Sequence, residues 1–340
     1  MQLGVNTGYW SSGPPVGVPE TLAVAEELGL DSAWASEAYG SDAFTPLAWW
    51  GSSTKFIRLG TAIAQMAART PAATAMAAIS MDHLSNGRFI LGLGVSGPQV
   101  VEGWYGQPYA RPLARTREYI SVIRQILARE GPVEFDGAFY ELPLRDGTGL
   151  GKPLRSTVHP LRADLPIMLA AEGPKNVALA AEIADGWLPF WFSPKSDAFY
   201  RAALAEGFSR TDARHTLDTF EVPCMVPVVP NPDISQAADM IRPMLALYVG
   251  GMGAKGANFH YEVFARMGWE EVCERVQRHY LAGHKAEAIS AIPLEMVEDV
   301  ALVGPPAKIK DELEHWKSTV ITTMLVAGPP ELLRMLAEWV

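Results

Sequence analysis

The chain has 340 residues, 49% hydrophobic and 19% charged, a balance typical of a globular protein with a large core. Its net charge of −10 disfavours nucleic acid and anionic membranes as partners. Charged residues interrupt every apolar stretch short of a membrane span, the amino terminus lacks a signal-peptide pattern, and the only two cysteines, Cys224 and Cys273, cannot form a CxxC site. We therefore expect a cytoplasmic protein with a reduced cysteine pair.

Short apolar strands alternate with helices along the chain. In the first half, the pattern predicts strands at 3–6, 32–35, 57–63 and 89–93, and helices at 19–28, 46–53, 71–83 and 113–129. In the second half, it predicts strands at 166–170, 186–190, 219–229 and 319–326, and helices at 174–184, 194–206, 234–249 and 330–340. Between these units lie an excursion at about 130–164, with a hairpin turning at Asp136-Gly137, and a helical insert at about 250–295.

Eight strand–helix units predict an α/β fold, a (β/α)8 TIM barrel that forms one domain over residues 1–340, with insertions after strands four and seven. No GxGxxG pattern follows the first strand, which argues against a doubly wound dinucleotide-binding sheet. In a barrel, the chemistry lies on the loops that follow the strands. The side chains at those positions are therefore the candidates for a site.

The fourth strand runs directly into a glycine-rich loop, with glycines at 92, 94 and 97. Glycine has no Cβ, so a ligand can approach the backbone closely there. An ordinary strand-to-helix turn would explain the same pattern.

The residues after the strands are mostly aromatic or amide side chains, with few acids or bases. This composition suits a flat heterocyclic ligand better than hydrolysis. The candidates for the walls of a substrate pocket are Asn6, Trp10, Tyr39, Tyr105 and Trp191.

Glu37 is the best-placed carboxylate, because it follows the second strand directly. It could accept a hydrogen bond from a ligand ring or act as an acid or base. It could equally cap a helix or pair with a neighbour, and Arg69 is a possible partner. Arg69 itself could instead hold a phosphate or carboxylate.

Gly173-Pro174-Lys175-Asn176 opens a helix after the fifth strand. Free backbone N–H groups and the positive end of the helix dipole would hold a phosphate there, and Lys175 would add charge. The alternative is an ordinary helix start with a solvated lysine.

The seven histidines show no HxH or HExxH spacing, so we predict no metal site. No Gly-x-Ser-x-Gly elbow and no cysteine–histidine pairing support nucleophilic acyl transfer. His83 precedes the amino end of a strand, where a structural role is expected.

Five segments together resemble the luciferase-like monooxygenase superfamily, in particular its deazaflavin-dependent oxidoreductases of actinobacterial type. They are 30–37 (LDSAWASE), 58–63 (RLGTAI), 82–97, 183–187 (IADGW) and 248–253 (YVGGMG). These segments occur in the same order as in that superfamily, and they span most of the chain.

The resemblance implies coenzyme F-420, or alternatively FMN, bound across the carboxyl-terminal mouth of the barrel. It implies a bulge with a non-proline cis peptide in the third strand, where Ala62-Ile63 is the matching pair. It also implies phosphate contacts from the segment of Ser96, Gly97 and Gln99 and from the segment Glu172, Gly173, Pro174, Lys175 and Asn176. The chain departs from this pattern at one position. Several deazaflavin-dependent relatives have an acid–histidine pair after strand two, whereas here Glu37 is followed by Ala38.

The predicted function is hydride transfer between the deazaflavin and a small organic substrate, with Glu37 as the catalytic candidate and a homodimer as the assembly. The alternatives are an FMN-dependent monooxygenase on the same fold, a barrel lyase or hydrolase, and a paralogue that binds the cofactor without catalysis. A lyase would normally need a Schiff-base lysine or a metal cluster on the strands, and the sequence predicts neither.

Overall fold

Eight parallel strands form a nearly closed barrel in the computed structural model, which describes residues 1–253, 256 and 258–340. The strands are β1 (Gln2–Asn6), β2 (Ser32–Ala35), β3 (Arg58–Thr61), β5 (Phe89–Gly94), β8 (Ile167–Ala170), β9 (Gly186–Leu188), β10 (Pro223–Met225) and β13 (Thr323–Val326). Hydrogen bonds join them in the order β10-β13-β1-β2-β3-β5-β8-β9, and a bridge between Gly186 and Glu221 brings β9 next to the start of β10. The predicted fold class is confirmed.

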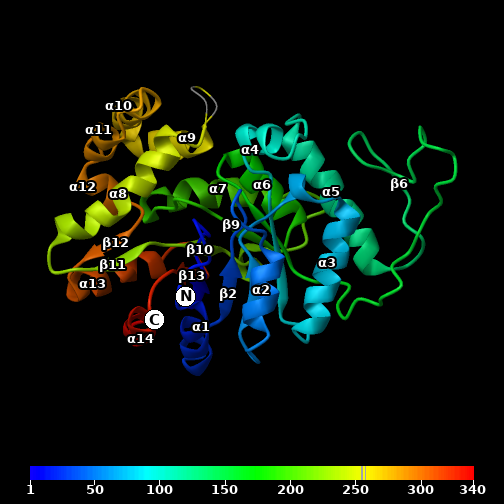
Figure 1. The fold of residues 1–340 in the computed structure, drawn as a ribbon, viewed down its shortest axis with the longest axis horizontal. Helices are drawn as coiled ribbons and strands as arrows, with labels where there is room; N and C mark the ends of the chain where they lie inside the picture. Colours follow the sequence, from blue (N-terminus) through cyan, green and yellow to red (C-terminus); the bar gives the residue numbers. More distant parts are fainter. Residues whose placement is uncertain (254–255, 257) are drawn as a thin grey trace.

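Helices lie between successive strands and surround the barrel (Figure 1). They are α1 (Val18–Glu27), α2 (Phe44–Gly51), α3 (Pro71–Leu84), α5 (Pro112–Ala128), α6 (Pro174–Ile183), α7 (Asp197–Phe208), α13 (Pro306–Lys317) and α14 (Pro330–Ala337). The sequence prediction omitted α13, although its buried residues Ile309, Leu313 and Trp316 have helical spacing. It also omitted the short helix α4 (Pro98–Gly103).

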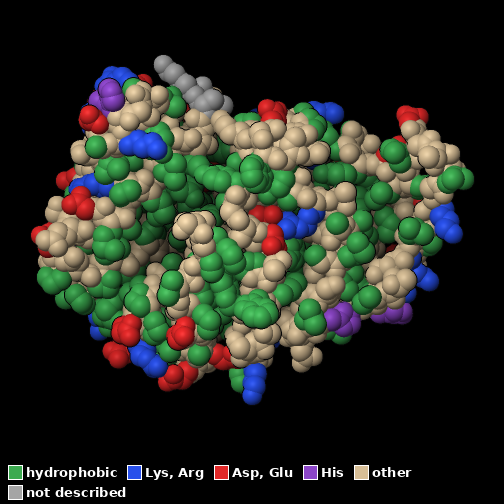
Figure 2. Space-filling view, viewed as in Figure 1, with side chains coloured by type: hydrophobic (Ala, Val, Ile, Leu, Met, Phe, Trp, Pro, Cys, Tyr) green, Lys and Arg blue, Asp and Glu red, His purple; other side chains and the backbone are tan. Residues whose placement is uncertain are grey.

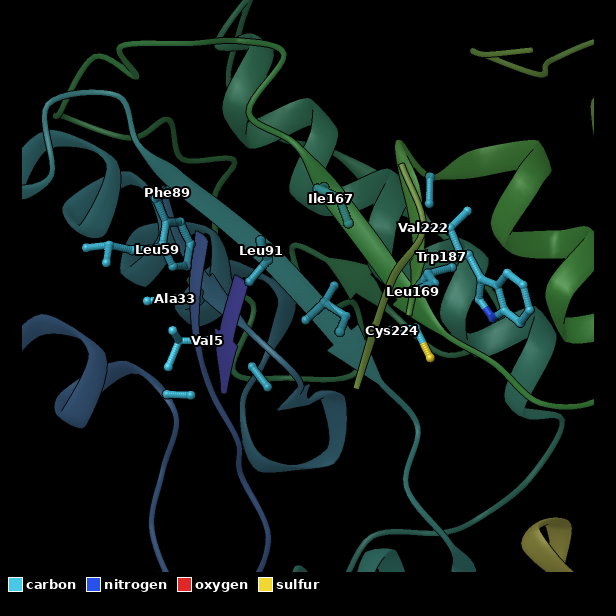
Figure 3. Packing of buried hydrophobic residues seen from close by; sticks show 14 of the residues in the cluster. Val5, Ala33, Leu59, Phe89, Leu91, Ile167, Leu169, Trp187, Val222 and Cys224 are labelled. Atoms are coloured by element: carbon cyan, nitrogen blue, oxygen red, sulfur yellow. The ribbon is translucent and has the colours of Figure 1, made fainter. Parts of the chain in front are cut away.

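Alternate strand residues divide between two apolar layers. Leu59, Phe89 and Leu91 pack outward against the helices, as Figure 3 shows. Trp34, Ile90, Met168, Leu188 and Leu325 form a separate cluster from five different strands, which fills the inside of the barrel. The inside of the barrel is therefore filled with side chains, and space for a ligand is left at the ends of the strands.

The third strand is interrupted, whereas the sequence predicted one strand over 57–63. β3 ends at Thr61, the Ala62–Ile63 peptide bond is cis, and the pairing with β5 resumes at β4 (Ala64–Gln65). The Thr61 hydroxyl accepts a hydrogen bond from the Gly92 N–H (2.9 Å) and donates one to the Gly92 carbonyl (2.7 Å). A Cβ on Gly92 would lie 1.8 Å from the Thr61 carbonyl oxygen. Gly92 is therefore required for contact between strands, not for approach of a ligand.

The excursion after α5 contains a small hairpin, β6 (Phe135–Asp136) and β7 (Glu141–Leu142). The predicted two-residue turn at Asp136-Gly137 is wrong, because Asp136 pairs with Glu141 and the loop between the strands is longer. The Glu118 carboxylate on α5 accepts hydrogen bonds from three backbone N–H groups of this loop, those of residues 138, 139 and 140. A side chain outside the hairpin thus fixes the wider turn.

The second insertion is larger than the segment 250–295 and has its own core. It includes α8 (Ile234–Gly250), α9 (Phe259–Phe264), α10 (Glu270–Leu281), α11 (Lys285–Ser290) and α12 (Leu294–Glu298), whose buried side chains form a second apolar cluster. Beneath it, β11 (Val228–Pro230) pairs with β12 (Leu302–Gly304) in a separate two-stranded sheet. We call residues 228–304 the insertion lobe.

Two predicted strands near this lobe are too long. The segment 219–229 contains β10 and β11, which belong to different sheets, and the eighth strand begins at Thr323 and not at 319. Apolar runs of this kind predict burial, but they do not show to which sheet each part belongs. The prediction that residues 250–295 are helical is confirmed for the part that the structure describes.

Candidate functional site

The carboxyl ends of the strands surround a mouth with an apolar floor. Ala62, Ile63, Ala170 and Met225 are only partly buried and pack on the cluster inside the barrel. A Cβ on Gly94 would lie 2.7 Å from the Ile63 side chain, so Gly94 allows Ile63 to lie flat against β5. Figure 2 shows the surface hollowed between the insertion lobe and the barrel, with hydrophobic side chains along the hollow. This floor suits one face of a planar ring.

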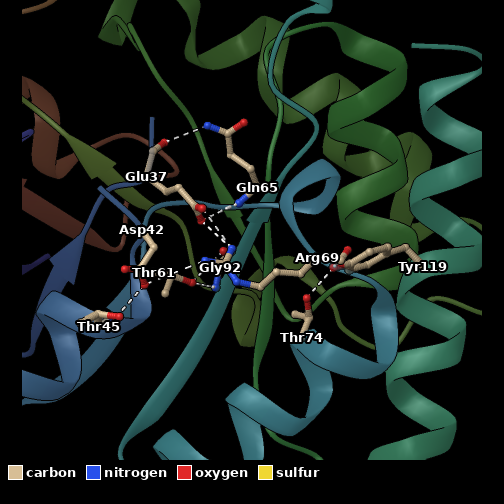
Figure 4. A network of polar contacts seen from close by, with 9 residues as sticks. All are labelled: Glu37, Asp42, Thr45, Thr61, Gln65, Arg69, Thr74, Gly92 and Tyr119. Atoms are coloured by element: carbon tan, nitrogen blue, oxygen red, sulfur yellow. Dashed lines mark hydrogen bonds and ion pairs between the residues drawn. The ribbon is translucent and has the colours of Figure 1, made fainter. Parts of the chain in front are cut away.

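Glu37 is fixed at one side of the mouth by an ion pair (Figure 4). Its carboxylate accepts hydrogen bonds from Arg69 Nη1 (3.0 and 2.9 Å) and from the Gln65 backbone N–H (3.1 Å). The Glu37 and Arg69 side chains are 4% and 21% exposed. Asp42 lies 3.9 Å from Arg69, and the guanidinium also covers the Phe44 ring. The pairing of Arg69 with Glu37, one of two alternatives from the sequence, is thus observed.

Tyr105 approaches this ion pair from the loop after α4. Burial raises the pKa of its hydroxyl, and the nearby Glu37 carboxylate raises it further. Of the other predicted wall residues, Trp10 lies against Trp50 with ring centroids 6.1 Å apart, and Tyr39 is exposed. Of these three predicted residues of the pocket wall, Tyr105 is thus the one whose hydroxyl lies near the Glu37 carboxylate.

The ends of the first two strands meet each other and the lobe. The Asn6 amide donates to the Ser36 hydroxyl (3.4 Å), and the Asn6 Oδ1 accepts from the Gly8 N–H (2.8 Å). Although the Tyr9 residue is 44% exposed, burial around its hydroxyl raises the pKa, and the proximity of Tyr248 and Ser36 lowers it again in part. Tyr248 belongs to α8, so the lobe reaches across the mouth to strands one and two.

The two predicted phosphate segments lie at strand ends, as expected. Ser96 has a positive φ of 58°, and a Cβ on Gly97 would lie 3.3 Å from the exposed Gln99 side chain. Gly173 precedes α6 without any side-chain cap, and Lys175 in the first turn is exposed. The start of α6 therefore offers the positive end of a helix dipole that no side chain among the described residues caps.

Glu172 meets a residue that the sequence analysis did not select. Its Oε1 lies 2.7 Å from Nδ1 of His260, on α9 of the insertion lobe. The two residues are 88 positions apart, and no local spacing signals their contact. Trp191, predicted as a wall residue, is buried in the core of the lobe beside Phe190, Tyr248 and Phe264.

Four buried polar atoms around the mouth have no hydrogen-bond partner among the described residues. They are Gln65 Oε1 in β4, Glu172 Oε2 and Trp191 Nε1 on the loops after the fifth and sixth strands, and His260 Nδ1 on α9. A buried polar group without a partner is unfavourable unless a ligand or water completes it. Together with the apolar floor and the uncapped helix α6, these atoms fit a flat, polar-edged cofactor that carries a phosphate.

The described residues lack two further features. No group of three or more histidine, cysteine, aspartate or glutamate side chains is arranged to hold a metal ion there. No helix in the same residues is both long enough and apolar enough to cross a bilayer.

A parallel (β/α)8 barrel with an apolar-floored mouth at the strand ends and a helical lobe after strand seven defines the class of protein. The sequence profile of the luciferase-like monooxygenase family matches residues 5–323, and the chain belongs to this family.

Related proteins agree with this assignment. The chain is 53% identical to a protein of Mycobacterium tuberculosis that is provisionally named a coenzyme F420-dependent oxidoreductase, over all of this chain and 99% of that protein. It is 26% identical to a 5,10-methylenetetrahydromethanopterin reductase of Archaeoglobus fulgidus, over 91% and 88% of the two chains.

Solved structures show the same fold. The coenzyme F420-dependent tetrahydromethanopterin reductase from Methanopyrus kandleri superposes with a TM-score of 0.80 at 22% identity, over 100% of this chain and 98% of that one. An F420-dependent secondary alcohol dehydrogenase in complex with an F420-acetone adduct gives 0.76 at 17% identity, with the same coverage.

Proposed function

We propose that the protein is an oxidoreductase that uses coenzyme F-420 to move a hydride to or from a small organic substrate. The observation that carries the proposal is the mouth itself, which combines an apolar floor at Ala62 and Ile63 with the uncapped start of α6 at Gly173. The relative that is 53% identical over the full length supports a deazaflavin as the cofactor. When bound, the deazaflavin supplies two-electron hydride chemistry and reacts poorly with oxygen.

The protein's own residues would bind and orient this cofactor. The backbone of Gly173 to Asn176 and the Lys175 ammonium would hold the phosphate, together with the loop at Ser96 and Gly97. Ala62 and Ile63 would support one face of the ring. The unpaired Gln65 and Trp191 atoms would meet polar atoms of a ligand.

The Glu37–Arg69 ion pair would keep one wall of the mouth rigid. Both oxygens of Glu37 already accept hydrogen bonds from Arg69. We therefore propose that Glu37 orients neighbouring groups, whereas proton transfer by Glu37 would require this ion pair to open. Asn6, Trp10, Tyr39, Tyr105 and Trp191 remain predicted walls of the substrate side.

Titration by fluorescence quenching with F-420 and with FMN tests the cofactor. We expect F-420 to bind at least tenfold more tightly than FMN. Tighter binding of FMN, or yellow FMN-loaded protein after purification, would favour the monooxygenase alternative. Tight F-420 binding with no turnover of any substrate class would favour the cofactor-binding paralogue.

A further inference from the structure

His260 and Glu172 form a largely buried acid–histidine pair at the mouth. Their side chains are 16% and 12% exposed, and 2.7 Å separates His260 Nδ1 from Glu172 Oε1. Glu172 follows β8, while His260 is the second residue of α9. The pair therefore joins the barrel to the insertion lobe at the end of the fifth strand.

Both members of the pair are held by further contacts. Asn258 caps α9 by accepting from the Tyr261 N–H (3.1 Å), and its amide donates to the carbonyls of Tyr248 (2.8 Å) and Val249 (2.9 Å). Arg266 Nη2 donates to the Glu172 carbonyl at 3.0 Å. These contacts fix the backbone at the start of α9 and at Glu172, from which the imidazole and the carboxylate extend.

Aromatic rings surround the imidazole. The Tyr248 ring centroid lies 4.7 Å from that of His260 with an interplanar angle of 79°, and Phe190 lies 5.8 Å away at 66°. Trp191 and Phe264 continue this wall. The surroundings therefore suit a substrate with an apolar body and one polar atom near His260.

The carboxylate determines which imidazole nitrogen remains for a ligand. A carboxylate beside Nδ1 favours the proton on that nitrogen, which leaves Nε2 for an outside group. The second oxygen of Glu172 is buried without a hydrogen-bond partner in the described chain, as are Trp191 Nε1 and His260 Nδ1, so the 2.7 Å approach of His260 to Glu172 is a charge contact and not an aligned hydrogen bond. Because the position after Glu37 is Ala38 and Glu37 is occupied by Arg69, His260 is the histidine of the mouth that is paired with an acid.

We infer that His260 exchanges a proton with the oxygen atom of a carbonyl or alcohol substrate, with Glu172 as its positioning residue. The inference rests on the proposed hydride transfer. In the reducing direction, the carbonyl carbon accepts the hydride from reduced deazaflavin, the C=O π electrons move to oxygen, and that oxygen takes the proton from protonated His260. An alcohol and neutral His260 result. In the reverse direction, neutral His260 takes the hydroxyl proton as the hydride leaves the carbon.

A first experiment tests the position of His260 without any turnover. Diethyl pyrocarbonate modifies accessible imidazoles, and peptide mass spectrometry measures the rate at each histidine. We expect saturating F-420 with cyclohexanone to slow modification of His260 at least tenfold, while exposed His284 in the same lobe is unchanged. Equal rates at His260 with and without these ligands would overturn the inference.

A second experiment tests the role of Glu172 by a spectroscopic signature. In protein labelled with ¹⁵N-histidine, the neutral ring of His260, assigned with His260→Gln, should carry its proton on Nδ1. In the cofactor-free protein, Glu172→Ala should shift the proton toward Nε2. An unchanged tautomer in a folded Glu172→Ala protein would remove Glu172 as a positioning residue.

Turnover then separates this inference from the proposed function. With reduced F-420 and cyclohexanone or benzaldehyde, His260→Gln should lower kcat at least 100-fold with the Kd for F-420 within threefold, and imidazole should partly restore His260→Ala. The control His284→Gln should keep kcat within twofold. Activity of His260→Gln within threefold of wild type would overturn the inference alone. If wild-type protein fails to bind F-420, the proposed function fails instead.

Discussion

Glu37 and Lys175 are both charged residues at the mouth, but their surroundings differ. Glu37 is buried and paired with Arg69, while Lys175 is exposed in the first turn of α6. A buried charge that loses its partner destabilises the fold, whereas an exposed charge affects mainly the ligand that it meets. Removal of the charge should therefore lower the stability of the fold at Glu37, whereas at Lys175 it should weaken the binding of a ligand.

We expect Glu37→Gln to lower the free energy of unfolding by about 2 kcal/mol, because Arg69 loses its counter-charge while the amide keeps one acceptor for the Gln65 N–H. Urea denaturation measures this change. Glu182→Gln is the control, since its partner Arg117 is 44% exposed, and it should cost less than about 1 kcal/mol. Wild-type stability with a fall in kcat of about 100-fold would instead indicate that Glu37 transfers a proton.

We expect Lys175→Ala to weaken F-420 binding by about tenfold, the loss of about 1–2 kcal/mol for one charge-assisted phosphate contact. Binding should persist, because the backbone N–H groups of α6 remain. Fluorescence titration at several salt concentrations measures both the affinity and its salt dependence. Lys310→Ala, an exposed lysine on α13, should change neither. An unchanged affinity for Lys175→Ala would place the phosphate elsewhere.

At the scale of elements, Asp185 joins four segments below the start of β9. Its carboxylate accepts hydrogen bonds from the Ile167 N–H at 2.7 Å, from Arg124 on α5, and from Arg214 at 3.1 Å, and it lies 3.0 Å from His215 Nε2. Burial alone would raise the pKa of Asp185, but the charge of Arg124 and these hydrogen bonds outweigh burial, so the pKa is lowered. One ionised carboxylate thus links these segments at the amino-terminal end of the strands.

We expect Asp185→Asn to lower the free energy of unfolding by about 2–4 kcal/mol at pH 7, because Arg124 and Arg214 lose their shared counter-charge. The folded pKa lies below the unfolded value, so the stabilisation is present above the ordinary pKa near 3.8 and is lost as the pH falls toward the folded value. Denaturation curves between pH 3 and pH 7 should therefore converge for the two proteins at low pH. A difference that stays constant over this range would contradict ionic stabilisation.

At the scale of the whole molecule, the excursion after α5 extends away from the barrel (Figure 1). It carries exposed apolar side chains, namely Leu144, Leu150, Leu154, Val158 and Leu161. It is tied back to the barrel by Arg162, whose guanidinium pairs with buried Asp82, and by His83, whose Nε2 lies 2.8 Å from the His159 carbonyl. Exposed apolar side chains concentrated on one projecting segment are typical of an interaction surface.

We expect the protein to form a homodimer that uses this segment. Light scattering coupled to gel filtration should give about twice the chain mass of 36.9 kDa. Leu150→Asp combined with Leu154→Asp should shift the mass toward the monomer, while Leu84→Asp on α3 serves as an exposed control. A monomeric wild-type protein at micromolar concentration would contradict the prediction.

The sequence alone determined the barrel, because strand and helix periodicity is local and eight units can close in few ways. It also placed Glu37 and the start of α6 at strand ends, since parallel strands bring those ends to one face, whereas the Ala62–Ile63 pair was implied only by the family resemblance. Local patterns did not show that Gly92 serves strand contact or that Glu118 sets the hairpin turn, because both depend on side chains distant in sequence.

Only the tertiary structure decided the contents of the mouth. The insertion lobe packs as a second core and carries Tyr248 and His260 back across the barrel, beside Tyr9 and Glu172. The tertiary structure also showed that Arg69 pairs with Glu37 and is not left free for a ligand phosphate or carboxylate. The sequence could not show this, because the interaction energy of two charged groups depends on their distance in space and not on their spacing in the chain. Residue types and order therefore define the framework, while contacts between distant segments define the chemistry.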